Sequence, residues 1–378
     1  MNDTPSIALL DPVGQMAGMD YYDWSLVKAL ANRGVMCHLF SNFTPSSQVA
    51  QVSTYSVYPN LGKSKWRKGI HLLLGHWKTF RSCKKMGIQQ VLLHAFHYRP
   101  LDYLTYWLAH RFGLKIAVIA HDIESFGSGD RQALKEKILC KMASVVFVHN
   151  QFSRKTLQAN LPQLPASKVQ VMPHGDYFDC ISKIPEQAAA REQLGWQPET
   201  HYLLFFGLIK QVKGLDILLE AMPDFPANTH LIIAGRPWKE DFSRYSELIQ
   251  KKGLQNRVTC LLHYIDDAKR DLLFKASNML IAPYKHIYQS GTILMAMSYG
   301  LPVVTSDLEP NKEFINDGQN GSLFESKNPD DLARAVSQLF EQPELSSQYA
   351  INSVETIRQQ NSWSLAAKVI HENFLTTS

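Results

Sequence analysis

Glycine and lysine gather in the second half of the chain, where an apolar run gives way to a helical pattern. The run 202–206 leads into the segment 207–214, which holds Gly207, Lys210 and Lys213. Glycine lets the backbone approach a ligand closely, and lysine at the start of a helix neutralises an anion. The segment therefore predicts a diphosphate site, although capping glycines beside solvated lysines would give the same pattern.

A second loop of this kind precedes the apolar helical run 293–299. Its residues are Gln289, Ser290, Gly291 and Thr292. The first N–H groups of a helix have no partner inside the helix and favour an anion, so this loop is predicted to offer amides to the diphosphate. An ordinary helix cap is the alternative for this loop alone. The two loops in this order, with a third segment beginning at Glu313, favour the binding site.

A histidine and an aspartate follow an apolar run in the first half of the chain. His121 and Asp122 come directly after the run 115–120. An imidazole with an ordinary pKa of about 6.5 can move a proton or donate to a hydroxyl. We predict that both residues take part in catalysis. A histidine that merely caps a turn is the alternative.

Short apolar runs, each followed by a longer helical segment, must position these residues. The runs lie at 6–10, 35–40, 90–93, 115–120, 144–148 and 169–172, and then at 202–206, 231–234, 258–262, 279–282, 301–305 and 321–324. This alternation predicts parallel strands with crossover helices, and ligands bind beyond the carboxyl ends of such strands. The expected fold is α/β, with two doubly wound Rossmann-like domains facing across a cleft.

The composition is that of an ordinary soluble protein, with 378 residues, 45% of them hydrophobic and 19% charged. Five cysteines lie far apart without a paired or metal-like spacing, which indicates a reducing compartment. The start of the chain has no basic segment followed by an apolar one, and no run of about 18 apolar residues occurs anywhere. We therefore expect a cytoplasmic protein of two domains.

Positive charge is concentrated in one stretch. Between Asp23 and Asp102 the chain has no acidic residue and eleven lysines and arginines. Within it, apolar residues recur at helical spacing, namely Trp66, Ile70, Leu73, Trp77 and Phe80. A basic amphipathic helix with tryptophan suits an anionic membrane surface, so residues 63–86 predict a peripheral contact at the inner face of the plasma membrane. An ordinary helix packed on the sheet is the alternative. No motif for nucleic acid accompanies the charge, and we expect no such partner.

Together these motifs resemble glycosyltransferase family 4, a family of the two-domain GT-B class. The resemblance is strongest over 202–324. The motifs that carry it are Phe206-Gly207 through Lys213-Gly214, Ile281-Ala282-Pro283-Tyr284, Gln289-Ser290-Gly291 and Gly300-Leu301-Pro302-Val303-Val304. The resemblance implies an acceptor-binding domain at 1–180, a donor-binding domain at 181–358 and a C-terminal helix at 359–378 that returns to the first domain.

The resemblance also implies roles for single residues. Lys213, together with Lys210, would neutralise the diphosphate of a UDP- or GDP-sugar, and Gly18 would let the backbone approach the same phosphates. Because lysines and amides would stabilise the departing diphosphate, we expect no metal ion and no cofactor beyond the donor. The family retains the configuration of the sugar and needs no carboxylate nucleophile. An inverting enzyme would instead use Asp20 or Asp122 as its base.

Two features depart from the usual pattern of the family. Leu208 stands where an arginine commonly follows the glycine of the first motif. Ile287 and Met295 stand where many relatives have a pair of glutamates that hold the sugar and the ribose. The chain thus resembles a subset with a Gln-Ser-Gly loop, in which Gln289 and the backbone would hold these groups.

The implied function is transfer of a sugar to a hydroxyl of a saccharide acceptor, lipid-linked, in bacterial surface polysaccharide synthesis. Two other functions stay open. An epimerase of sugar nucleotides would share the architecture but would need acid and base groups around the sugar. A non-catalytic binding or scaffolding subunit could keep the fold after losing the acidic pair.

Overall fold

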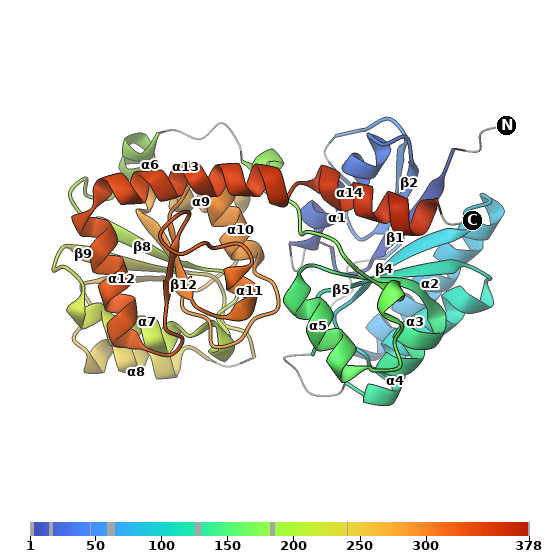
Figure 1. Cartoon of the computed structure of the whole chain (residues 1–378), viewed down its shortest axis with the longest axis horizontal. Helices are drawn as coiled ribbons and strands as arrows, with labels where there is room; N and C mark the ends of the chain where they lie inside the picture. Colours follow the sequence, from blue (N-terminus) through green and yellow to red (C-terminus); the bar gives the residue numbers. More distant parts are fainter. Residues whose placement is uncertain are drawn as a thin grey trace. The chain divides into compact units, whose positions relative to one another are not determined.

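The computed structural model describes residues 4–14, 18–45, 47–58, 65–124, 130–181, 186–239 and 241–376, with the side chains of 65–68 left aside. The chain divides into two compact units (Figure 1). The first unit comprises residues 1–175 and 361–378, and the second comprises residues 176–360. The C-terminal segment therefore belongs to the same unit as the N-terminus.

The first unit is built on a sheet of seven parallel strands in the order β3-β2-β1-β4-β5-β6-β7. The strands are β1 (Ser6–Asp11), β2 (Met36–Ser41), β3 (Val52–Ser56), β4 (Gln90–Ala95), β5 (Lys115–Ala120), β6 (Ala143–Val148) and β7 (Val169–Val171). The sequence analysis missed β3, because this edge strand has the polar sequence Val-Ser-Thr-Tyr-Ser and little apolar character. The strand order reverses between β1 and β4, as in doubly wound sheets.

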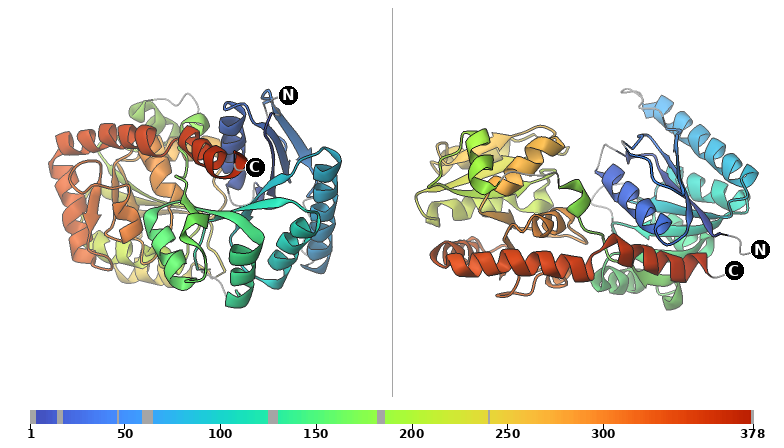
Figure 2. Two further views of the ribbon diagram at one scale, coloured as in Figure 1. Left: turned by 45° about the vertical axis from the view of Figure 1, so that its right-hand side comes forward. Right: turned by 90° about the horizontal axis from the view of Figure 1, so that it is seen from above.

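Helices cover both faces of this sheet (Figure 2). They are α1 (Met19–Ala31), α2 (Lys65–Lys85), α3 (Pro100–Arg111), α4 (Gln132–Glu136) with its π-helical continuation Lys137–Met142, α5 (Gln151–Asn160) and α14 (Trp363–Ile370). On one face α1 and α14 pack against each other and enclose an apolar core that includes Leu26, Trp363 and Phe374. Helices α2 and α3 contact each other on the opposite face.

The second unit has a sheet of six parallel strands in the order β10-β9-β8-β11-β12-β13. The strands are β8 (His201–Phe206), β9 (Thr229–Ala234), β10 (Val258–Leu261), β11 (Met279–Ala282), β12 (Val303–Ser306) and β13 (Ser322–Phe324). The helices are α6 (Gln187–Leu194), α7 (Leu215–Ala221), α8 (Ser243–Lys251), α9 (Asp267–Ala276), α10 (Gly291–Ser298), α11 (Glu309–Lys312), α12 (Pro329–Glu341) and α13 (Pro343–Gln360).

Alternate residues of the strands in the second unit enter two separate cores. Leu203 and Phe205 pack with α7, α8 and α12, whereas Tyr202 and Leu204 pack with α9 and α10. Side chains of a strand point to opposite faces in turn, so a sheet buried on both sides needs apolar residues at every position. The predicted fold class, an α/β protein of two doubly wound Rossmann-like domains, is confirmed.

Candidate active-site residues

Two glycines bring the exits of β8 and β9 into backbone contact. Gly207 has φ 102° and Gly235 has φ 142°, both outside the range that other residues adopt readily. A Cβ atom on Gly235 would lie 2.0 Å from the carbonyl oxygen of Gly207. The N–H of Gly207 donates to the carbonyl of Ala234 at 2.9 Å. The backbone after β8 is therefore held by close packing that admits no side chain.

The loop after β8 also lies against the loop after β11. A Cβ atom on Gly214, which has φ 70°, would lie 1.8 Å from the carbonyl oxygen of Pro283. The N–H of Lys285 donates to the carbonyl of Val212 at 2.8 Å. The structure thus brings together the two segments in which the sequence predicts anion-binding loops.

Side chains continue this junction toward the start of α10. The ammonium of Lys213 lies 4.0 Å from the centre of the Tyr284 ring, and the Tyr284 hydroxyl is 3.0 Å from Ser290 Oγ. Ser290 caps α10 by accepting the N–H of Ile293 at 3.2 Å. Thr292 Oγ1 lies 3.5 Å from the position that a Cβ atom on Gly207 would take. Gly207, Lys213 and the Ser290 loop therefore meet at the carboxyl edge of the sheet, where Gly291 begins α10 and Gln289 is half-buried.

The other predicted residues of this unit lie around that junction. The Lys210 ammonium is 4.6 Å from the centre of the Trp238 ring, so its contact is with the loop after β9. Glu313 is half-buried directly after α11, which follows β12. Asn311, which the sequence analysis did not single out, is fully buried and donates to Thr305 Oγ1 at 3.0 Å and to the Ser306 carbonyl at 2.9 Å. These bonds fix the segment that carries Glu313 to the exit of β12.

Ile287 and Met295 are part of an apolar cluster of the second unit. Ile287 is buried in it, and the partly buried Met295 packs against it. Burial of these two side chains is favourable because both are apolar. A carboxylate at either position of this chain would have to be accommodated in that cluster.

In the first unit, His121 follows β5 as predicted, but it is one of several histidines at the same edge. His94 lies near the end of β4, His149 follows β6 and His174 follows β7. The Tyr22 ring packs edge-on against all four imidazoles with centroid distances of 5.1–5.8 Å. The sequence analysis assigned no role to the other three, although His94 and His149 come one residue after an expected strand and His174 comes two residues after one.

Hydrogen-bonding distances join these side chains in series. His94 Nε2 lies 2.9 Å from Asp23 Oδ1, and His94 Nδ1 lies 2.8 Å from His121 Nε2. His121 Nδ1 lies 3.4 Å from His149 Nε2, and His149 Nδ1 lies 3.1 Å from the Met172 carbonyl oxygen. We call Asp23, His94, His121, His149 and the Met172 carbonyl the histidine chain. Both ring nitrogens of His121 are engaged in it.

Burial suppresses charge in the histidine chain. It lowers the pKa of His94 to about 4 and that of His149 to about 3, and it holds the pKa of His121 well below the ordinary value. Burial also raises the pKa of Asp23, and of Asp11 beside it, to about 8. Burial therefore favours the neutral form of each of these groups.

The remaining predicted residues of the first unit lie near this edge. Asp122 follows His121 and is half-buried. Gly18 precedes α1 with φ 72°, and within the described residues no atom lies within 4 Å of a Cβ atom built on it. Its role beside a ligand stays a prediction. No group of three or more histidine, cysteine or acidic side chains in the described part of the chain is arranged to hold a metal ion.

Helix α2 divides its apolar residues between two sides. Phe80 is fully buried, so it cannot belong with Trp77 to an apolar surface that contacts a membrane. Ile70, Leu74 and Trp77 are exposed, as are Leu104 and Trp107 on α3, each by 40–56%. Trp66 falls among residues whose side chains are not described. We call these five exposed residues the α2–α3 patch.

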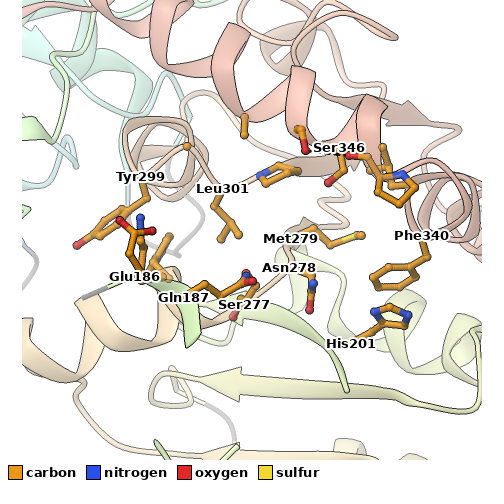
Figure 3. A pocket seen from close by; sticks show the side chains of 18 residues that line it. Glu186, Gln187, His201, Ser277, Asn278, Met279, Tyr299, Leu301, Phe340 and Ser346 are labelled. Atoms are coloured by element: carbon orange, nitrogen blue, oxygen red, sulfur yellow. Dashed lines mark hydrogen bonds between the residues drawn. The ribbon is translucent and has the colours of Figure 1, made fainter. Parts of the chain in front are cut away.

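A pocket of about 660 Å³ opens at the other edge of the second unit (Figure 3). His201 and Met279, at the amino ends of β8 and β11, line it together with Asn278, Tyr299 and Phe340. Figure 3 shows these side chains around the opening. Ligands of parallel sheets bind at carboxyl ends, so this pocket is separate from the junction of Lys213 and Ser290.

The fold of the two units is that of GT-B proteins. Anabaena HepE, solved in complex with UDP and glucose, superposes with a TM-score of 0.76 at 19% identity, covering 97% of this chain and 98% of that one. Residues 186–356 match the family model of glycosyl transferases group 1.

Curated relatives agree with this match. The chain is 24% identical over 355 residues to a D-inositol 3-phosphate glycosyltransferase of Mycolicibacterium gilvum, across 86% of this chain and 78% of that protein. It is 30% identical over 179 residues to a GDP-mannose:glycolipid 4-beta-D-mannosyltransferase of Xanthomonas campestris pv. campestris, across 46% and 48%. The chain contains a glycosyltransferase group 1 domain and is a glycosyltransferase.

Proposed function

We propose that the second unit binds a nucleotide-diphosphate sugar, with UDP or GDP as its nucleotide, and that the chain transfers the sugar to a saccharide hydroxyl. The junction of the two loops supports this proposal best. It places the Lys213 ammonium, the capped start of α10 and the backbone of closely packed glycines at one edge of the sheet. A helix start and a lysine together suit a diphosphate.

The chemistry required of this site is stabilisation of the departing diphosphate. As the bond from the anomeric carbon to the phosphate oxygen breaks, negative charge grows on that oxygen. The Lys213 ammonium and the amides of Gly291 and Thr292 would stabilise this charge, which supports a metal-independent reaction. In a retaining transfer the acceptor oxygen forms the new bond on the same face, and its proton passes to the departing phosphate oxygen. Lys210 would add charge near the nucleotide, and Gln289 and Glu313 would contact the sugar or the ribose.

The first unit is proposed to serve the acceptor and the reacting sugar. His121 would hydrogen-bond a sugar hydroxyl, Asp122 would orient the groups around it, and Gly18 would admit the phosphates to the backbone. The Gln-Ser-Gly loop of this chain, with Ile287 and Met295 in an apolar cluster, supports donor contacts that differ from those of relatives with paired glutamates.

Calorimetric titration with UDP and GDP tests donor binding. Lys213→Ala is expected to weaken binding by about 10- to 100-fold, since a hydrogen bond to a charged group contributes about 1.5–3 kcal/mol. Lys251→Ala removes the same charge from an exposed position of α8 and is the matched control. Equal affinities of the two variants would count against the site. Transfer to saccharide acceptors, followed by mass spectrometry of the product, tests the reaction itself.

We further propose that the acceptor is lipid-linked, in a pathway of bacterial surface polysaccharide, and that the protein binds the inner face of the plasma membrane peripherally. The α2–α3 patch supports this because basic residues adjoin it, with the Arg81 guanidinium 5.1 Å from the centre of the Trp77 ring. Tryptophan and basic side chains both favour an anionic lipid surface. Within the described ranges, no helix has the length and apolar character needed to cross a bilayer.

Flotation with vesicles of neutral and anionic lipid tests the membrane proposal. The double variant Trp77→Ser/Trp107→Ser should lose flotation with anionic vesicles. A control double variant, Tyr264→Ser/Ile351→Ser, removes apolar residues of the second unit that are 68% and 63% exposed and should float like the wild type. If both double variants float alike, the patch does not bind membrane.

A further inference from the structure

A single carbonyl fixes the direction of hydrogen bonding along the histidine chain. The Met172 carbonyl can only accept, so His149 Nδ1 must carry the hydrogen that faces it at 3.1 Å. The neutral His149 ring then has a lone pair on Nε2. That nitrogen accepts from His121 Nδ1 at 3.4 Å. His121 is therefore protonated on Nδ1 and has its own lone pair on Nε2.

The same reasoning continues to the carboxyl group at the other end. His121 Nε2 accepts from His94 Nδ1 at 2.8 Å, which leaves the lone pair of His94 on Nε2. That nitrogen lies 2.9 Å from Asp23 Oδ1. Two acceptors cannot form a hydrogen bond, so beside a neutral His94 the Asp23 carboxyl is the donor and carries a proton.

An ion pair between a His94 imidazolium and an Asp23 carboxylate would have the same heavy-atom positions. It is disfavoured because Asp23 is 0% exposed and a second buried carboxyl, Asp11, lies beside it. The oxygens of Asp11 already accept the N–H groups of Val13 at 2.8 Å and Gly14 at 2.7 Å. Two adjacent carboxylates without solvent repel each other, so at least one of this pair retains a proton, and the lone pair on His94 Nε2 assigns that proton to Asp23.

We propose that the neutral carboxyl of Asp23 acts through His94 as a positioning residue, which fixes His121 with its hydrogen on Nδ1. Two observations give this assignment a consequence for the reaction. His149 is buried and the side chain of His94 is only 3% exposed, whereas His121 is half-buried directly after β5, so His121 is the member that a ligand can reach. Its contact to His149 is the longest link of the chain, and an incoming oxygen can replace it.

His121 then serves the reaction as a hydrogen-bond donor through Nδ1, and a role as general base is disfavoured. This second part rests on the proposed function, whereas the tautomers do not depend on it. The chain is also distinct from a metal site, since its nitrogens point at one another across 2.8 and 3.4 Å and do not converge on a common point.

Nitrogen-15 NMR of the full-length protein tests the tautomers directly. At pH 7, His94, His121 and His149, assigned by single His→Gln variants, should all show a protonated Nδ1 and an unprotonated Nε2. Asp23→Ala removes the donor and should convert His94 to a mixture of tautomers, with kcat reduced at least about 10-fold. Asp23→Asn still donates a hydrogen to His94 Nε2, so it should restore the tautomers and raise kcat at least about 10-fold above that of the alanine variant.

The pH dependence separates a neutral donor from a structural role. Titratable groups that face the chain are Asp11 of β1, Asp20 and Tyr22 of α1, and His174 after β7. Above about pH 8 the carboxyl pair ionises, so the wild type should lose the ordered tautomers there while Asp23→Asn keeps them. An imidazolium signal from His94 at pH 7 would overturn the proposal, as would an Asp23→Asn variant that behaves like Asp23→Ala, or stoichiometric binding of added Zn²⁺ by the wild type. Correct tautomers in a protein that transfers no sugar would refute the proposed function alone.

Discussion

Gly214→Ala should damage the second unit through two separate costs. The residue has φ 70°, and the left-handed region costs a residue with a Cβ atom about 1–2 kcal/mol. The new methyl group would also lie 1.8 Å from the carbonyl oxygen of Pro283 and 2.9 Å from its carbonyl carbon. Both are backbone atoms, so the loop after β11 must shift. Overpacking of this kind costs about 1–3 kcal/mol, and the total loss of stability should be about 2–5 kcal/mol.

Gly195 provides a matched control in the same unit. It ends α6 with φ 69° and ψ 27°, whereas Gly214 has φ 70° and ψ 28°. A Cβ atom on Gly195 would meet no described atom within 4 Å. Gly195→Ala therefore carries the conformational cost without the contact. The difference between the two variants, about 1–3 kcal/mol, measures the contact with Pro283.

Thermal unfolding and UDP titration of the full-length variants measure both effects. The loop that shifts carries Lys285, whose N–H is bonded to Val212, and it leads to the Ser290 cap. Displacement of binding groups by about 1 Å can cost up to about 100-fold, so we expect Gly214→Ala to bind UDP at least about 10-fold more weakly. Gly195→Ala should stay within about 2-fold of the wild type. Equal unfolding temperatures and equal affinities in the two variants would refute this reasoning.

Three further predictions concern stability. Trp363→Ala should lower the free energy of unfolding by about 3–5 kcal/mol, because this buried ring packs 4.8 Å from Tyr22 in the core of the first unit; chemical unfolding measures it. Asn311→Ala should cost about 1–3 kcal/mol by leaving the Ser306 carbonyl without its donor, whereas Asn352→Ala, at a half-buried position, should cost less in the same assay. The unfolding temperature should peak near pH 6.5. Burial lowers the pKa of His76 and His149 to about 3 and that of His94 and His174 to about 4, so stability falls as pH drops from about 6.5. Burial raises the pKa of Asp11 and Asp23 to about 8, so stability also falls as pH rises to about 8.

The sequence predicted the parts of the fold that follow from local pattern. Fully apolar runs such as 231–234 predict strands that are buried on both faces, and the helical segments between the runs indicate parallel pairing. The sequence did not predict edge strand β3, because an edge strand is less buried than a central strand and needs fewer apolar residues. Phe80 recurs with Trp77 at helical spacing but is buried while Trp77 is exposed, since a helical repeat does not show which of its residues the rest of the fold covers.

The candidate site was predictable to the extent that it depends on backbone motifs. Gly207, Lys213 and the Ser290 loop could be predicted because they are glycines or lie close to the start of a helix. The histidine chain could not be predicted in this way. His94 stands inside an apolar run, and its contact with Asp23 requires β4 to lie beside β1, a pairing between segments that are far apart in the sequence. Strand order, which no local pattern determines, decides which edge residues meet.

The two units use the same edge of a parallel sheet in different ways, and this determines which substitutions each tolerates. In the first unit, side chains at the strand ends hydrogen-bond one another, so each donor or acceptor fixes the protonation of the next. Loss of the donor at Asp23 therefore affects the tautomer of His121. In the second unit, glycines let strand exits and loops meet through their backbones, and Lys213 is held over the Tyr284 ring. Arginine can keep the charge at position 213, but no side chain fits at Gly214 or Gly235. The proposed binding by the second unit would therefore depend on residues that lack a Cβ atom, whereas the first unit would depend on the identity of each hydrogen-bonding group.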